Sequence, residues 1–351
     1  MGLRTRLTFL VLALAGIVST RAQSAGTEPE RHVIVIGVDG IVIRVDGLSV
    51  DAVDSASTPR LHELMARGAW TLEAHGVMPT LSSPNWESVI GGAPPEQHGI
   101  TSNGYFRRLV EFAPACQDAD GKFPTILGVL RDQRAGSRMA VFHEWAGFAN
   151  LVERRGPDVM KHESTSARTV AAALEYWKER HPSLLFIHLD GADHAGHQTG
   201  WLSTNYYQAV TEADGYVGQV LDEVGREEGW DSTFVLVTSD HGGTRHGHGR
   251  NSLAEILIPW ILTGPGVIPG KLSAPVNTYD TAATLAWIYG VDTPRCWTGR
   301  PVLAAFKPSL LLTATRPAPA PPQPSCAPNA PVTGAALRFP GQPEDGLKAR
   351  K

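Results

Sequence analysis

Four short segments of the chain are apolar at consecutive positions rather than at alternate ones. They are residues 32–38 (HVIVIGV), 184–189 (LLFIHL), 234–238 (FVLVT) and 258–262 (IPWIL). A strand whose sheet is covered by helices on both sides carries apolar side chains on both faces, so such runs are typical of buried parallel strands. We therefore expect these segments to be strands of a mostly parallel sheet.

Segments with helical periodicity alternate with these runs. Residues 59–67 begin with Pro59, a residue favoured in the first turn of a helix, and Thr58 is a candidate N-cap. Residues 166–180 and 281–289 are further candidates, the latter closed by Gly290. Residues 206–224 carry an apolar stripe formed by Val210, Ala213, Val217, Val220, Leu221 and Val224. Alternating strands and helices indicate an α/β fold.

The first 22 residues have the pattern of a secretory signal peptide. Arg4 and Arg6 precede an apolar run at residues 7–18, and Thr20 and Ala22 stand before a plausible cut at Gln23. The run is too short to cross a bilayer comfortably, so we favour a cleaved signal peptide over an uncleaved anchor. A periplasmic or secreted protein with no stable membrane anchor follows from that interpretation.

The rest of the chain is expected to divide into a main domain and a tail. Residues 23–312 form the domain, within which residues 104–158 are less regular and are interpreted as partly an insertion or cap over the sheet. Residues 313–351 form a C-terminal tail, and its first part is rich in proline and alanine, which is typical of an extended or disordered segment.

Composition and charge exclude several classes of protein. Of the 351 residues 42% are hydrophobic and 19% are charged, and the formal net charge is −4, which is typical of a soluble globular protein. Removal of residues 1–22 takes away three arginines and no acidic residue, so the remaining chain is unsuited to a nucleic-acid polymer. The three cysteines leave at most one pair, for which we favour Cys296 with Cys326 over a pair with Cys116, although connectivity cannot be read from sequence.

Candidate chemistry follows the apolar runs. Asp39, Asp193 and Asp240 each come at or shortly after the end of one of them. Ligand sites of open α/β sheets gather beyond the carboxyl ends of the strands, so we expect these aspartates to converge at one edge. Taken singly, each one has the alternative interpretation of a turn or cap residue.

Histidines accompany these aspartates. His197 lies four positions after Asp193, His241 directly follows Asp240, and His246 and His248 lie in a glycine-rich loop. Mixed Asp and His ligation suits zinc better than magnesium or calcium, and manganese or iron can replace zinc. The alternative is a cluster of polar loops that binds no metal.

The segment PTLSSPN, residues 79–85, contains Ser82 directly before a possible helix. One interpretation makes Ser82 an N-cap. The other makes it a nucleophile stabilised by the helix dipole and a metal. A loop rich in glycine and proline follows, and it can present backbone N–H groups and the Asn103 amide to an anion.

These motifs in this order resemble the alkaline phosphatase superfamily, above all its branch of type I phosphodiesterases and nucleotide pyrophosphatases. The similarity runs from about residue 32 to residue 302 and rests on Asp39, PTLSSPN, PEQHGITSN, DHAGH, SDHGG and GHG. It implies a three-layer α/β/α sandwich and two adjacent zinc ions. Asp193, His197 and His248 would hold one ion, with His248 preferred to His246 on spacing. Asp39, Asp240 and His241 would hold the other, with Ser82 as nucleophile and ligand, and Asn103 as the phosphate contact.

Departures from the family pattern limit the assignment. The diesterase branch commonly has threonine where Ser82 stands, so the nucleophile does not settle the ester class. Ser82 is followed by Pro84 and then Trp86, which does not fit sulfatase maturation. No arginine lies between Arg67 and Arg107, which favours a diester or pyrophosphate over a monoester. The positive charge that a monoester requires could come from residues that fold back towards Ser82, namely Arg107, Arg108 and Lys161.

Four aromatic residues could stack on a base or aryl group of the substrate, although core positions are the commoner role of such residues. They are Trp86, Tyr105, Trp145 and Trp201.

The leading hypothesis is a secreted hydrolase of phosphodiesters or nucleotide pyrophosphates that acts through a phosphoseryl intermediate. Its partner would be a small phosphate ester, and its oligomeric state is left open. The alternatives are a phosphomonoesterase with the same core, a metal-binding pseudoenzyme that recognises a surface ligand, and a transferase or mutase that passes the phosphoryl group on.

Overall fold

The computed structural model describes residues 30–42, 52–104, 113–227 and 229–313. Residues 1–22, expected to be a signal peptide, lie outside the described residues, as does the expected tail except for Thr313. Close contacts divide the chain after Glu30, so the fold below is that of the chain from Arg31 onward. Among the described helices, none combines the length and the apolar character needed to cross a membrane.

The described strands form one eight-stranded sheet in the order β4-β3-β5-β1-β6-β7-β2-β8. β7 pairs antiparallel with β6 and β2, and the other neighbours are parallel. The prediction of a mostly parallel sheet is therefore confirmed. The strands are β1 (His32–Val38), β2 (Ala69–His75), β3 (Met139–His143), β4 (Val159–His162), β5 (Leu184–Leu189), β6 (Thr233–Thr238), β7 (Leu257–Thr263) and β8 (Gly270–Lys271).

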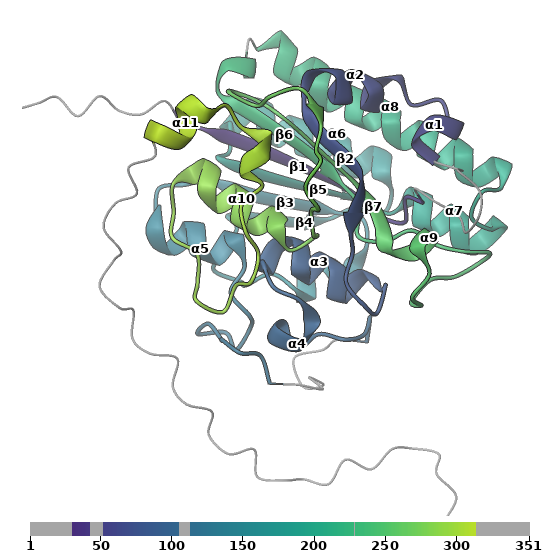
Figure 1. Ribbon diagram of the computed structural model, residues 1–351, viewed down its shortest axis with the longest axis horizontal. Coiled ribbons are helices and arrows are strands. Elements are labelled where there is room, and N and C mark those ends of the chain that lie inside the picture. The colour runs from purple at the N-terminus through teal and green to yellow at the C-terminus, as the bar shows by residue number, and fades with distance from the viewer. Residues whose placement is uncertain (1–29, 43–51, 105–112, 228, 314–351) are drawn as a thin grey trace, which may run out of the picture. The chain divides into compact units, whose positions relative to one another are not determined.

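Helices cover both faces of the sheet, which confirms the three-layer α/β/α sandwich (Figure 1). One layer contains α3 (Ser82–Gly91), α5 (Ile126–Gln133) and α10 (Asp280–Tyr289). The other contains α1 (Ala52–Ser55), α2 (Pro59–Arg67), α6 (Ser166–Arg180), α7 (Gly191–Thr199) and α8 (Thr204–Arg226). Three shorter helices are α4 (Pro95–His98), α9 (Leu253–Ile256) and α11 (Pro308–Thr313), and three 3-10 turns span Ala146–Asn150, Gly229–Asp231 and Leu303–Ala305.

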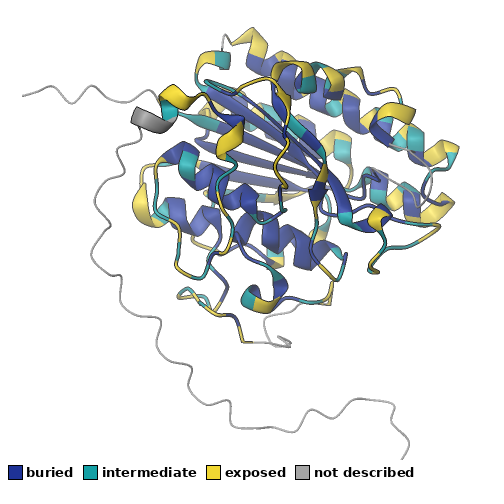
Figure 2. Cartoon of the chain, viewed as in Figure 1, coloured by how far each residue is buried: buried dark blue, intermediate teal, exposed yellow. Residues whose placement is uncertain are grey.

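The central strand shows why consecutive apolar residues were needed. Val33 and Val35 of β1 join the core under one helical layer, whereas Ile34 and Ile36 join the core under the other. Successive side chains of a strand point to opposite faces, so a strand between two apolar layers must be apolar at every position. Figure 2 shows the result, with buried strands between helices whose outer faces are exposed.

The helix α2 has the expected bounds but not the expected cap. Thr58 makes no capping hydrogen bond, because its hydroxyl donates to the carbonyl of Val53. The carboxylate of Asp214, from α8, instead accepts the backbone N–H groups of Arg60 (3.1 Å) and Leu61 (2.7 Å). A residue about 150 positions away therefore supplies the cap, which no local pattern could reveal.

Residues 104–158 were interpreted as partly an insertion or cap. Within this segment, β3 lies inside the sheet between β4 and β5, and α5 packs in the core beside α3 and α10. The described residues of this segment therefore add short elements to the sheet and to one helical layer, and the interpretation of the segment as partly an insertion or cap stays a prediction.

The disulfide prediction was wrong. Cys116 pairs with Cys296, with a Cα–Cα distance of 6.1 Å and a sequence separation of 180 residues. Both cysteines pack against the core under the α3, α5 and α10 layer, so the fold brings them together despite their separation. Cys326, the expected partner, lies outside the described residues.

Candidate functional site

The register of the sheet brings the three predicted aspartates to one edge. Val38 of β1 pairs with Leu189 of β5, and Gly37 pairs with Thr238 of β6. Asp39 follows β1 directly, and its N–H donates to the carbonyl of Leu189 over 2.9 Å. Asp240 comes two residues after β6, and Asp193 lies in the first turn of α7, just after β5.

A glycine allows the close approach of α7 to the end of β1. Gly40 has a φ of +77°, and a Cβ atom there would lie 2.8 Å from the Cα of Asp193. Any other residue would both strain the backbone and push α7 away. Glycine at position 40 is therefore a geometric requirement of this edge.

Asp39, Asp240 and His241 form the first of two groups of candidate ligands, called here the buried group. Each of the three residues is at most 1% exposed. The Nε2 atom of His241 lies 3.4 Å from Asp39 Oδ1 and 3.2 Å from Asp240 Oδ2. One ligand atom from each residue lies within 4.8 Å of the others, so the three can hold one ion.

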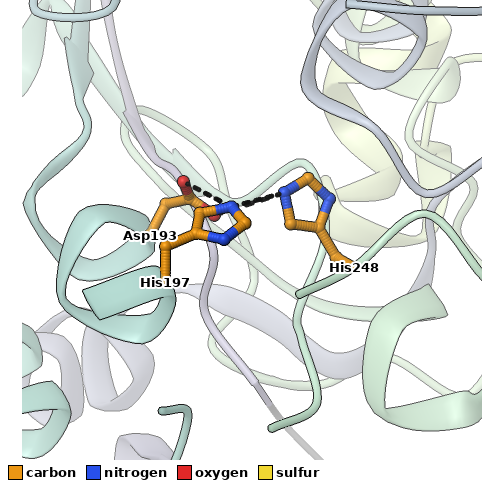
Figure 3. A group of neighbouring side chains, drawn as sticks. All are labelled: Asp193, His197 and His248. Carbon is orange, nitrogen blue, oxygen red and sulfur yellow. Dashed lines mark hydrogen bonds and ion pairs between the residues drawn. The ribbon is translucent and has the colours of Figure 1, made fainter. Parts of the chain in front are cut away.

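Asp193, His197 and His248 form the second group, called here the rim group (Figure 3). Asp193 and His197 come from one face of α7, and His248 comes from the loop after β6. His197 Nε2 lies 3.5 Å from Asp193 Oδ2 and 3.1 Å from His248 Nε2. The rings of His248 and His241 stack with centroids 3.7 Å apart, so the two groups are in direct contact.

The histidines of both groups share one hydrogen-bonding pattern. Nδ1 donates to a backbone carbonyl in His241 (Gly242, 2.8 Å), His248 (Thr80, 2.7 Å) and His197 (His246, 3.0 Å). Since a carbonyl can only accept, each neutral ring carries its proton on Nδ1 and presents a lone pair at Nε2. Ligating histidines characteristically donate their other N–H group in this way.

The buried carboxylates of both groups would be stabilised by a positive charge. Asp39 Oδ1, Asp193 Oδ1 and Asp240 Oδ2 are buried oxygens without a hydrogen-bond partner in the described part of the chain. Burial, and then the neighbouring Asp39, raises the pKa of Asp193 to about 9. Burial lowers the pKa of His241 to about 3. Bare imidazole nitrogens and unpartnered carboxylates converge, which is the donor set that zinc accepts, so the residues fit a divalent cation.

Ser82 lies beside the buried group. It is the first residue of α3, with Leu81 as N-cap, and its Oγ is 3.3 Å from Nε2 of His241. The side chain of Asn85 holds the segment before it, because Nδ2 donates to the carbonyls of Leu81 (3.0 Å) and Pro79 (3.2 Å). The hydroxyl is thus placed at a helix N-terminus, where negative charge is stabilised.

Asn103 lies next to Ser82 in space. Its Oδ1 accepts the backbone N–H of Ser83 over 2.8 Å, and the residue is exposed. Because that hydrogen bond fixes the amide with its oxygen towards α3, Nδ2 is the atom that Asn103 can offer to an anion.

Asp190 and Glu144 belong to this site and were not predicted. Asp39, Asp190 and Asp193 form a third group with one ligand atom each within 4.8 Å, and burial, then the charge of Asp39, raises the pKa of Asp190 to about 8. Glu144 Oε2 accepts the N–H of Asp190 (2.9 Å) and the hydroxyl of Ser166 (2.5 Å). Asp190 directly follows β5, so the rule that selected Asp39 also points to it.

Other expectations concerned aromatic and basic side chains. Trp86 is fully buried and donates Nε1–H to Asp39 Oδ2 (3.0 Å), while Trp201 is 6% exposed and donates to the carbonyl of Gly40 (3.0 Å). Both therefore support the site as core residues. Lys161 of β4 forms an ion pair of 2.9 Å with Glu163, the residue after that strand. Tyr105, Arg107 and Arg108 lie outside the described residues.

The sequence matches the type I phosphodiesterase / nucleotide pyrophosphatase family over residues 40–252, more than half of the chain. The protein belongs to this family. The matched span contains every residue of the buried and rim groups except Asp39, together with Ser82 and Asn103.

Individual relatives are distant. Human ectonucleotide pyrophosphatase/phosphodiesterase family member 5 is 25% identical over 215 residues, which cover 58% of this chain and 45% of the relative. Bis(5'-adenosyl)-triphosphatase enpp4 of Xenopus laevis is 26% identical over 211 residues, which cover 58% of this chain and 46% of the relative. The chain thus matches about half the length of these relatives.

Solved structures show the same fold. Murine ectonucleotide pyrophosphatase / phosphodiesterase 5 has a TM-score of 0.65 at 17% identity, covering 79% of this chain and 100% of that chain. An inactive variant of the same mouse protein was solved in complex with AMP, with a TM-score of 0.64 at 17% identity and coverages of 79% and 98%. The phosphonate monoester hydrolase of Agrobacterium radiobacter has a TM-score of 0.60 at 14% identity, with coverages of 79% and 77%. These neighbours have alkaline phosphatase-like folds.

Proposed function

We propose that the protein is an exported, metal-dependent hydrolase of phosphodiesters or nucleotide pyrophosphates that uses Ser82 as its nucleophile. The observation that carries the proposal is the convergence of Ser82 with the bare Nε2 atom of His241 and the unpartnered oxygens of Asp39 and Asp240. A serine–histidine pair alone would suggest a general base. Two buried carboxylates facing the same nitrogen favour a cation instead.

The buried group and the rim group would each hold one ion, and zinc is the metal that their donor set favours, with manganese or iron as substitutes. When bound, such ions supply Lewis-acid stabilisation of the attacking and leaving oxygens of a phosphoryl group. Ser82 would be a ligand as well as the nucleophile.

Ser82 and Asn103 would then have distinct roles in the reaction. The Ser82 oxygen attacks phosphorus, the bond from phosphorus to the leaving oxygen breaks, and a phosphoseryl intermediate forms. Water then attacks phosphorus, the bond to Ser82 Oγ breaks, and the serine is restored. Asn103 Nδ2, held by the contact of its Oδ1 with Ser83, would bind an oxygen of the phosphoryl group.

Diesters and pyrophosphates are favoured over monoesters because described basic side chains are scarce beside Ser82. No ion pair joins an arginine or a lysine to the buried or rim group among the described residues, and Lys161 is paired with Glu163. A diester carries less charge than a monoester and needs less neutralisation. The relatives named for nucleotide substrates, and the neighbour solved with AMP, agree with this preference.

Export is supported by the signal-peptide pattern of residues 1–22 and by the Cys116–Cys296 disulfide, since such bonds persist in oxidising compartments. The periplasm or the exterior of the cell is therefore the proposed location.

The test is the Ser82→Ala variant. Loss of the nucleophile should lower kcat about 10³-fold or more while most of the zinc remains bound, because the other ligands are intact. The activity is measured on bis(p-nitrophenyl) phosphate and p-nitrophenyl phosphate, with metal content by mass spectrometry. Rapid quenching of the wild type should trap the phosphoryl group on the peptide that contains Ser82, as a p-nitrophenyl phosphate ester from the diester and as phosphate from the monoester.

Ser88→Ala is the matched control, since Ser88 is a buried serine of the same helix whose hydroxyl contacts His98 rather than the site. Its kcat should stay within a few-fold of the wild type. Full activity in Ser82→Ala would remove the serine from the mechanism, and a higher kcat/KM on the monoester would overturn the ester preference.

A further inference from the structure

Glu255 is a fully buried carboxylate beside the site but outside both ligand groups. It lies on the short helix α9 and is 0% exposed. Its Oε2 accepts the Thr80 hydroxyl (2.9 Å) and the Arg250 backbone N–H (2.5 Å), and its Oε1 accepts the Thr244 hydroxyl (3.2 Å). Buried acidic residues are rarely retained without a paired charge, so these contacts require an explanation.

The donors come from the two segments that build the site. Thr80 precedes Ser82 by two residues, whereas Thr244 and Arg250 stand at the two ends of the loop that carries His248. The backbone carbonyl of Glu255 also accepts the N–H of Gly242, next to His241. One residue therefore ties the serine segment to the histidine loop.

Thr80 connects Glu255 to the rim group directly. Its carbonyl accepts Nδ1–H of His248 over 2.7 Å, and its hydroxyl accepts the N–H of Gly249 over 3.0 Å. The single hydroxyl proton is shared between two acceptors, Glu255 Oε2 at 2.9 Å and the carbonyl of Arg250 at 2.7 Å. The chain of contacts runs from the Glu255 carboxylate through Thr80 to the ring whose Nε2 faces Asp193 and His197.

The charge of Glu255 has no partner of the usual kind. Its three side-chain donors are two hydroxyls and one backbone N–H, and within the described residues it forms no ion pair with lysine, arginine or histidine. An isolated buried anion is costly unless a positive charge lies near. Thr80 links Glu255 to His248, and the two side chains also interact electrostatically, so a cation bound at Nε2 of His248 would supply a positive charge on the side of the ring that Glu255 supports.

We propose that Glu255 is a positioning residue for the rim cation. It fixes the orientation of His248 through Thr80, and its negative charge offsets the charge of the ion. This inference rests on the proposed function only in that His248 holds a cation, because it concerns the binding of the ion and not the hydrolysis step. The expected effect falls on metal affinity before it falls on turnover.

The test is zinc binding to the metal-free, full-length protein in competition with a chromophoric chelator and without substrate. Glu255→Gln keeps the size of the side chain and removes its charge. One of the two zinc-binding steps should weaken about tenfold or more, the range found when the outer partner of a ligating histidine is removed.

Glu153→Gln is the matched control. Glu153 is also 0% exposed and accepts hydrogen bonds from Thr125, but it lies under α5 and away from both ligand groups. Its zinc affinities should equal those of the wild type. If Glu255→Gln does not fold, Thr80→Val, which keeps the backbone carbonyl bound to His248 but removes the hydroxyl shared by Glu255, Arg250 and Gly249, should weaken the same step. Thr80→Ser, which restores the hydroxyl, should recover it.

The outcomes separate this inference from the proposed function. Less than a threefold change in both steps for Glu255→Gln, or for Thr80→Val where it replaces that variant, overturns the inference and leaves the hydrolase proposal intact. A wild type that binds two zinc ions without hydrolysing any phosphate ester overturns the hydrolase proposal, while a weakened step in the variants still supports the role of Glu255. A wild type that binds none of zinc, manganese and iron overturns both.

Discussion

The buried group and the rim group offer the same kinds of ligand in two different settings. Asp39, Asp240 and His241 follow strand ends and are at most 1% exposed, whereas the side chain of His197 in the rim group is 45% exposed. Sheet register fixes the first group, while a helix and a loop assemble the second. The difference indicates that the buried group depends on the sheet register, and that His197 is the member of the rim group most exposed to water.

The largest expected effect comes from breaking the buried group. Asp240→Asn removes the charge of a candidate ligand that is 0% exposed and that is held in place by the end of β6. Zinc content should fall by one ion per chain, and kcat/KM should fall by more than about 100-fold, beyond the effect of an outer partner. Metal analysis and kinetics at raised zinc should show no recovery. Recovery at millimolar zinc would contradict the distinction between the groups.

A smaller effect is expected for the rim group. His197→Ala opens an exposed position that water can fill, so zinc affinity should fall about 10- to 100-fold while the fold is kept. Raising the zinc concentration should restore much of the activity, as measured by kcat/KM against free zinc. The two groups would prove equivalent if His197→Ala resisted rescue as Asp240→Asn is expected to do.

Removal of metal should expose the repulsion among the site carboxylates. In the metal-free protein burial and the charge of Asp39 raise the pKa of Asp193 to about 9 and that of Asp190 to about 8. A carboxyl group whose pKa is higher in the folded state than in the unfolded state stabilises the fold fully only at pH values below its unfolded-state pKa. This contribution to the free energy of unfolding is lost as the pH rises to the folded-state pKa. Chelated protein should therefore lose stability progressively from about pH 4 to pH 9, and bound zinc should reduce that slope. Urea unfolding at several pH values, with and without chelator, measures it.

Glu87 supplies the control for that experiment. Burial, followed by the charge of Glu153, raises its pKa well above the ordinary value, but it lies in the middle of α3 outside both groups. Glu87→Gln should reduce the loss of stability at high pH by the same amount whether or not metal is present. An effect that depended on the chelator would tie Glu87 to the site.

Periodicity was a sufficient guide where an element is long or buried on both faces. The bounds of β1, β5, α2 and α6 agree with the sequence prediction, because each carries an unbroken apolar run or a clear helical period. The short strands β3 and β4 were missed, since four or five residues hold too little pattern to distinguish a strand from a loop.

The sheet also explains why the predicted site residues lie close to one another. Asp39, Asp193 and Asp240 lie together because strand ends of a parallel sheet must meet at one edge. The other predicted site residues also lie around that edge, and their roles stay predictions. They are Ser82, Asn103, His197, His241 and His248. Glu255 and Glu144 could not be selected, because nothing in the sequence distinguishes an acidic residue that is buried among hydroxyl and N–H donors from one on the surface.

The Cys116–Cys296 disulfide has a consequence for how the chain is made. In the unfolded chain Cys296 lies 180 positions from its native partner but only 30 from Cys326. Loop-closure entropy alone favours the shorter, incorrect ring by about 1.6 kcal/mol. A chain whose cysteines oxidise before it folds will therefore tend to close the wrong ring first, and thiol exchange after collapse of the helical layer is the route to the correct one. Recombinant material should accordingly be oxidised late, or in the presence of an isomerase.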